Sequence, residues 1–131
     1  MSNAVKAVSK NVRFSPRKVN EVAALVRGRS VSDALTILDH TPRRSAKAVS
    51  KTIASARANA TNNHNYKEES LVISEIFVNA GVRFKRYRPA AHGRALPFIR
   101  RSSNIFVTVT GDQRPAKKPA AKRTTSKKEA K

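Results

Sequence analysis

Residues 82–101 place seven Lys and Arg residues, and no acid, between two apolar segments. A cation that is buried without a counter-charge loses its hydration at a large cost in free energy, so this segment lies outside any core. A connection of this length without structure of its own is uncommon inside a compact domain. The segment is therefore either disordered or continues its two flanking segments as one long β-hairpin.

The flanking segments have the patterns of β-strands. Residues 71–78 are β-branched and aromatic on nearly both faces, which is typical of a strand inside a sheet. Residues 105–110 alternate with the period of two that a half-buried strand requires. Residues 5–12 form a weaker strand pattern. If residues 71–110 form a single hairpin, each of its strands reaches roughly 65 Å, which exceeds the diameter of the body.

Three helices are predicted between residues 15 and 65, because apolar residues recur there with helical spacing. The start and stop signals are Ser15-Pro16, Gly28, Ser30 with Asp33, Thr41-Pro42 and Asn62 to Asn65. The apolar stripes are Val19, Val22, Ala23 and Val26, then Val31, Ala34, Leu35 and Leu38, then Ala46, Val49, Ile53, Ala56 and Ala60.

Together these patterns predict an α+β fold. Three helices cover one face of a small three-stranded antiparallel sheet, from which a long β-hairpin protrudes. We expect residues 1–111 to form a single domain, with residues 82–101 as its extended basic hairpin tip. Residues 112–131 contain no large apolar residue, so they are expected to be a disordered Lys/Arg-rich tail.

The charge of the whole chain indicates a polyanionic partner. Its 131 residues include 28 Lys and Arg against 8 Asp and Glu, a formal net charge of +20.

The absence of cysteine excludes disulfide scaffolds and thiolate chemistry. The longest strictly apolar run, residues 22–26, is far shorter than the roughly 20 residues of a membrane span. No secretory signal is visible in residues 1–15. We therefore expect a small cytosolic protein that faces nucleic acid.

Residues that would support an enzyme are missing from the sequence. The three histidines, His40, His64 and His92, have no metal-ligand spacing. Asp33 and Asp39 lie on different faces of one predicted helix, so they do not form a catalytic pair. The four glycines stand alone, without a phosphate-binding loop. The prediction is a protein without enzymatic activity, metal or cofactor.

The composition of residues 82–101 indicates the chemistry of the partner. Lys and Arg neutralise phosphates and release their counterions. Aromatic rings and Arg planes stack on unpaired bases. Pro89 and Pro97 are expected to limit β-pairing near the tip, where Gly93 allows a tight turn. Three of the seven aromatic residues of the chain lie in this segment, namely Phe84, Tyr87 and Phe98.

Several motifs in the right order resemble a known family over roughly residues 5–110. The family is the bacterial large-subunit ribosomal protein, twenty-second of its series, whose long β-hairpin lines the peptide exit tunnel. The motifs that carry the resemblance are Ser15 to Val19 with Val26 to Gly28, Ser55 to Ala60, Lys85-Arg86, Pro89, Ala91, Gly93 to Ala95, Arg101, Ser103 and Ile105.

The resemblance implies a structural protein of the large ribosomal subunit. Its body would bind large-subunit rRNA near the tunnel exit, beside neighbouring ribosomal proteins, as a monomer within the cytoplasmic ribosome. Its hairpin would thread inward through rRNA to the tunnel constriction, where the tip faces the nascent chain. By position in the motif, residues 84–86 would flank one side of the tip and residues 92–94 the other.

These considerations give two sets of candidate rRNA-binding residues. The hairpin set is Arg83, Phe84, Lys85, Arg86, Tyr87, Arg88, His92, Gly93, Arg94, Arg100 and Arg101. The body set, chosen for its excess of cations around the predicted helices, is Arg13, Arg17, Lys18, Arg27, Arg29, Arg43, Arg44, Lys47 and Lys51.

Two other classes remain open from the residues alone. An architectural DNA-binding protein would share the charge and could insert a β-arm with a proline wedge into the minor groove. Such proteins are normally dimeric, and this sequence shows no spare apolar face for a dimer. A cationic membrane-surface peptide is the weaker alternative, because the basic segments lack the apolar face of an interfacial helix.

Overall fold

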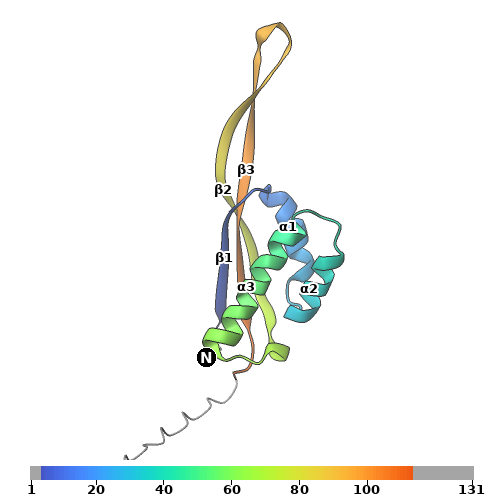
Figure 1. The fold of residues 1–131 in the computed structure, drawn as a ribbon, viewed down its shortest axis with the longest axis vertical. Coiled ribbons are helices and arrows are strands. Elements are labelled where there is room, and N and C mark those ends of the chain that lie inside the picture. The colour runs from blue at the N-terminus through green and yellow to red at the C-terminus, as the bar shows by residue number, and fades with distance from the viewer. Residues whose placement is uncertain (1–3, 114–131) are drawn as a thin grey trace, which may run out of the picture.

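The computed structural model describes residues 4–113, in which three helices pack against one face of a three-stranded sheet and a hairpin extends beyond it (Figure 1). This confirms the predicted α+β architecture. The elements in chain order are β1 (Val5–Val12), α1 (Pro16–Val26), α2 (Val31–His40), α3 (Ala46–His64), a 3-10 turn (Glu68–Ser70), β2 (Val72–Pro89), a second 3-10 turn (Ala91–Gly93) and β3 (Ala95–Thr110).

The sheet is antiparallel with strand order β1-β3-β2, so β3 is its central strand. The expectation that residues 71–78 lie inside the sheet is wrong, because β2 is an edge strand. Its second apolar face lies on the side of the sheet opposite the core. There the Phe77 ring stacks on Phe106 of β3, with centroids 4.7 Å apart and planes 10° from parallel. Phe77 thus packs against a cross-strand aromatic partner on this face while remaining 38% exposed.

The core lies between the helices and the sheet. Every residue of the three predicted helical stripes is buried, except Leu35, which is partly buried. The sheet contributes its inward-facing residues to the same cluster, namely Val5, Ala7, Ile73, Ile76, Ile105, Val107 and Val109. The helical spacing of the sequence therefore predicted the buried faces correctly.

The helix ends agree with the sequence signals in part. Asp33 N donates to Ser30 Oγ at 3.2 Å, which confirms the cap of α2. Gly28 has a φ of 74° just beyond α1, as the predicted left-handed stop requires. The expected start of α3 at Thr41-Pro42 is wrong, because that helix begins at Ala46. Thr41 instead ends α2, and its Oγ1 donates to the Ile37 carbonyl at 2.7 Å.

Residues 82–101, from here on the arm, continue β2 and β3 past the last paired residue of β1 (Figure 1). Of the two alternatives for this segment, the hairpin is therefore correct. Pairing extends to Pro89 and Ala95, so the expectation that the prolines limit it is wrong. Each strand of a two-stranded ribbon has an outer edge, where a proline removes no ladder hydrogen bond.

The tip of the arm is a 3-10 turn closed by two left-handed residues, His92 with a φ of 58° and Gly93 with a φ of 67°. Ala90 N donates across it to the Arg94 carbonyl at 2.7 Å. At the other end of the hairpin formed by β2 and β3, Lys67 N donates to the Asp112 carbonyl at 2.9 Å. Asp112 is therefore bonded to the body, and the rest of the expected tail, residues 114–131, lies outside the described residues.

Candidate nucleic-acid interface

The arm presents two faces, because residues paired across an antiparallel ladder point to the same side. One face continues the side of the sheet that the helices do not cover. Aromatic rings and guanidinium groups alternate on it, and we call it the Phe/Arg face. It carries Phe84, Arg86, Arg88, Leu96, Phe98 and Arg100. The opposite face carries Arg83, Lys85, Tyr87, Pro97, Ile99 and Arg101.

Two cation–π contacts organise the Phe/Arg face. The Arg86 guanidinium carbon lies 5.5 Å from the centre of the Phe84 ring. The Arg88 guanidinium carbon lies 4.9 Å from the centre of the Phe98 ring. These contacts orient the guanidinium groups while leaving both rings more than a third exposed, at 44% and 36%. The face therefore offers flat aromatic and cationic surfaces to a partner.

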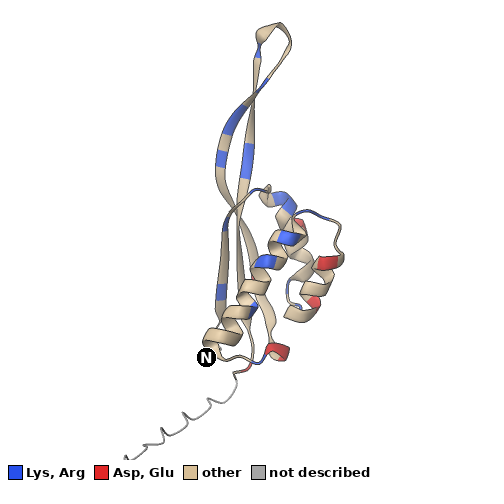
Figure 2. Ribbon diagram, viewed as in Figure 1, with Lys and Arg blue, Asp and Glu red and all other residues tan. Residues whose placement is uncertain are grey.

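The positive charge of the arm is not compensated within the described residues. All seven arm cations are exposed, and no acidic residue lies on the arm (Figure 2). The ion pairs of the described chain lie in the body, where Arg43 meets Glu21 at 3.0 Å and Arg57 meets Glu68 at 3.2 Å. The arm therefore carries an unscreened positive field, which is the electrostatic property of a phosphate-binding surface.

The structure corrects one positional expectation for the arm. Residues 92–94 lie in the tip turn, as expected. Residues 84–86 do not flank the tip, because they pair with residues 98–100, three to five ladder positions below Pro89. The Phe84 side chain consequently lies near the base of the arm, beside the body.

Four cations of the body set gather around one groove between α2 and α3. Arg43, Arg44, Lys47 and Lys51 line it, from the loop before α3 and from the first turns of that helix. Arg43 is partly neutralised by Glu21, whereas the other three have no ion pair among the described residues. Asp39 is the one acidic residue in the lining, so the groove carries an excess of positive charge.

The remaining cations of the body set divide into two groups. Arg13 and Arg17 lie at the base of the arm, each lining a cavity with arm residues, and Lys18 is exposed on the first turn of α1. Arg27 and Arg29 are also exposed, and each donates a hydrogen bond to a backbone carbonyl of the body. Arg27 Nη2 donates to the Ile76 carbonyl at 3.1 Å, and Arg29 Nε donates to the Leu25 carbonyl at 2.9 Å.

Sequence reasoning missed two polar residues at the base of the arm, Asn11 and Ser102. Both line the cavity that contains Arg13. Asn11 has a φ of 56°, and its N–H donates to Asn104 Oδ1 at 2.9 Å. An Asn that interrupts a strand pattern is a signal for such a left-handed position. Nothing in the local sequence marks Ser102, since its place depends on strand register.

Other classes of site find no support between residues 4 and 113. No helix there has the length and apolar character needed to span a bilayer. That part of the chain also holds no group of three His, Asp or Glu residues positioned to bind a metal ion. The fold and its exposed cations instead define a small basic structural protein with a protruding β-arm.

Comparison with known proteins gives this class a family. Residues 7–110 match the model of ribosomal protein L22p/L17e, and the chain belongs to that family. It is similar to the large ribosomal subunit protein uL22 of Oceanobacillus iheyensis, at 50% identity over 80% of this chain and 93% of the relative. It is also similar to uL22 of Streptococcus pyogenes, at 44% identity over 82% of this chain and 95% of the relative.

Family membership tests the expectations about the identity, the role and the location of the protein. The identification as a bacterial large-subunit ribosomal protein of this family is confirmed. The chain is a structural ribosomal protein rather than an enzyme, and its location is the cytoplasmic ribosome.

Proposed function

We propose that this structural constituent of the large ribosomal subunit binds large-subunit rRNA through its basic body and its arm. The arm reaches the wall of the nascent-peptide exit tunnel, as the family resemblance implies, and its tip faces the nascent chain. The observation that carries the proposal is the arm itself, with seven exposed cations and no acid. From Arg83 to Pro89 it extends roughly 20 Å past the body at the usual strand rise.

The surface chemistry favours RNA over duplex DNA as the partner. Exposed rings such as Phe84, Tyr87 and Phe98 stack on unpaired bases, which a folded rRNA offers in its loops and bulges. Guanidinium groups held beside those rings contact phosphates through a planar fork. The groove lined by Lys47 and Lys51 supplies a second phosphate-binding surface on the body.

Removing two arm cations tests the proposal. We expect the Arg86→Gln/Arg94→Gln protein to bind large-subunit rRNA more weakly. The plot of log affinity against log salt should become shallower by roughly 1 to 2, since each phosphate contact contributes about 0.7 to 0.9. The measurement is fluorescence anisotropy with the full chain over a salt series.

The matched control is Lys6→Gln/Lys10→Gln, which removes two exposed cations from β1, outside both candidate sets. Its salt slope should remain that of the unmodified protein. Equal slopes for all three proteins would contradict a role for the arm. Equal affinity for duplex DNA of the same length would instead support the architectural DNA-binding alternative.

A further inference from the structure

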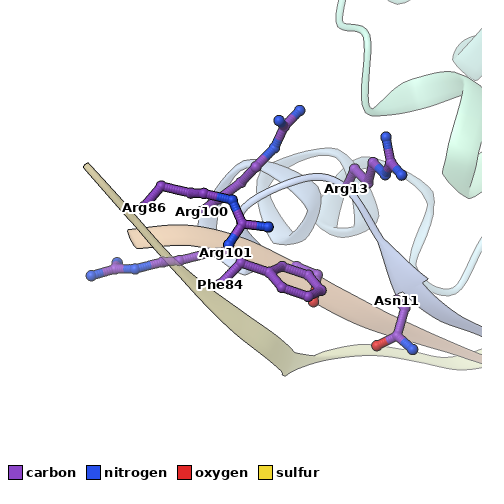
Figure 3. Close-up of a pocket in the computed structure, with 7 residues that line it drawn as sticks. Asn11, Arg13, Phe84, Arg86, Arg100 and Arg101 are labelled. Atoms are coloured by element: carbon purple, nitrogen blue, oxygen red, sulfur yellow. The ribbon is translucent and has the colours of Figure 1, made fainter. Parts of the chain in front are cut away.

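A cavity of about 380 Å³ lies at the base of the arm, and we call it the neck cavity (Figure 3). Its volume falls within the roughly 300–1,000 Å³ of small-molecule sites. Its lining comes from three places in the chain, the end of β1 with the residue after it, β2 and β3. The lining residues are Asn11, Arg13, Phe84, Arg86, Arg100, Arg101 and Ser102.

Two irregularities in the sheet form this cavity. β1 has one extra residue between Ser9 and Val12, and β2 has one extra residue between Ala80 and Arg83. They lie opposite adjacent stretches of β3, residues 103–105 and 101–103, which meet at Ser103. Bulges of this kind bend a strand and redirect its side chains. Ser102 Oγ donates to the Val82 carbonyl at 2.7 Å and so fixes the bulge of β2.

Close packing holds the two strands of the neck in this arrangement. A Cβ atom added at Gly81 would lie 2.6 Å from Ser102 Oγ and 3.2 Å from the backbone of that residue. A side chain at this crossing would therefore displace Ser102, which lines the neck cavity. The absence of a side chain at Gly81 thus allows β2 and β3 to approach closely at the base of the arm.

The lining residues include one Phe, four Arg and no acidic residue, and Arg101 is the one of these Arg residues whose side chain belongs to the opposite face of the arm from Phe84. Phe84 is paired with Arg100 across the ladder, and Arg86 lies over one side of its ring. Arg13 belongs to the chain after β1, separate from the arm strands (Figure 3). Asn11 adds an amide group, which can donate to and accept from the edge of a base. A ring beside several cations fits a ligand that is both planar and anionic.

We propose that the neck cavity binds one unpaired nucleotide of the large-subunit rRNA. Its base stacks on Phe84, and its phosphate is held by Arg13 and Arg100. The inference rests on the proposed function, to which it adds a defined binding site. A free phosphate would leave the ring unused, and a protein segment without acidic residues would leave the Arg side chains without partners.

The test is chemical probing of unpaired bases in large-subunit rRNA bound by the full chain at saturation. We use dimethyl sulfate for A and C and a carbodiimide for G and U. The unmodified protein should protect one unpaired base that becomes reactive again with Phe84→Ala. Phe84→Ala should weaken binding about 5- to 150-fold, the range for loss of one stacked base. Phe84→Tyr keeps the ring and should retain the protection.

Two comparisons separate this site from general binding by the arm. Phe98→Ala removes a ring from the same face with the same kind of Arg contact, but outside the cavity, and should leave that base protected. Arg100→Gln should lower the salt slope by about 0.7 to 0.9, whereas Phe84→Ala should leave the slope unchanged because the ring carries no charge.

The outcomes distinguish the two proposals. If Phe84→Ala binds rRNA and protects the same bases as the unmodified protein, the neck cavity holds no base and the inference is overturned, while rRNA binding stands. If the unmodified protein does not bind the rRNA, the proposed function fails and the inference fails with it.

Discussion

A protein with a shortened arm is expected to lose most of its rRNA affinity while keeping a folded body. The change replaces residues 84–100 with Asn-Gly, a two-residue turn that closes the hairpin after the pair Arg83–Arg101. It removes five cations and both rings of the Phe/Arg face. Affinity should fall by roughly two orders of magnitude or more, and the salt slope should become shallower by roughly 3 to 5. Anisotropy over a salt series measures both.

The body should tolerate this change, because no residue between 84 and 100 is buried. Circular dichroism and thermal unfolding should therefore resemble those of the unmodified protein. A control variant keeps the arm but replaces Arg86, Arg88 and Arg100 with Lys, which retains the charge and removes the guanidinium planes. It should keep the salt slope. Unchanged rRNA affinity of the shortened protein would contradict the role assigned to the arm.

Ile53→Ala is expected to have the largest effect on stability. Ile53 is fully buried at the middle of α3, where it belongs to the cluster between the helices and the sheet. Truncating such a residue removes apolar contacts and leaves a cavity, so the free energy of unfolding should fall by about 2–5 kcal/mol. Denaturant unfolding followed by circular dichroism measures it.

The matched control is Ile99→Ala, the same substitution on the arm, where the side chain is 48% exposed. It should change the free energy of unfolding by no more than about 0.5 kcal/mol. Equal losses for the two variants would mean that the arm contributes to the core, against the separation of arm and body described above.

The helices could be predicted because their apolar residues keep a regular spacing, and burial of that stripe decides how a helix packs. Their boundaries were less certain. Thr41-Pro42 has the composition of a helix start, but the Thr41 hydroxyl donates to the Ile37 carbonyl of the preceding helix instead. A local signal that suits two roles cannot decide between them without the tertiary contacts.

The charge of the arm predicted its exposure, and the flanking strand patterns made a hairpin one of two alternatives, but the two faces of the arm could not be predicted. The extra residue between Ala80 and Arg83 shifts the alternation of β2 by one position. A one-residue shift exchanges the two faces of a strand. The grouping of Phe84 with Arg100 and Arg13 therefore depends on a bulge that the sequence pattern does not predict. The motif resemblance also placed residues 84–86 beside the tip, whereas the ladder continues beyond them to the pair Pro89–Ala95.

The most direct test of the account is to locate the arm within the large subunit. The sequence has no cysteine, so Ala91→Cys introduces a single attachment site at the tip for an iron probe that cleaves nearby rRNA. Asp39→Cys, exposed on α2, is the matched site on the body. In assembled large subunits, the tip probe should cut rRNA that lines the peptide exit tunnel, and the body probe should cut elsewhere. Cuts from the tip that fall outside the tunnel, or that coincide with those from the body, would contradict the proposed function.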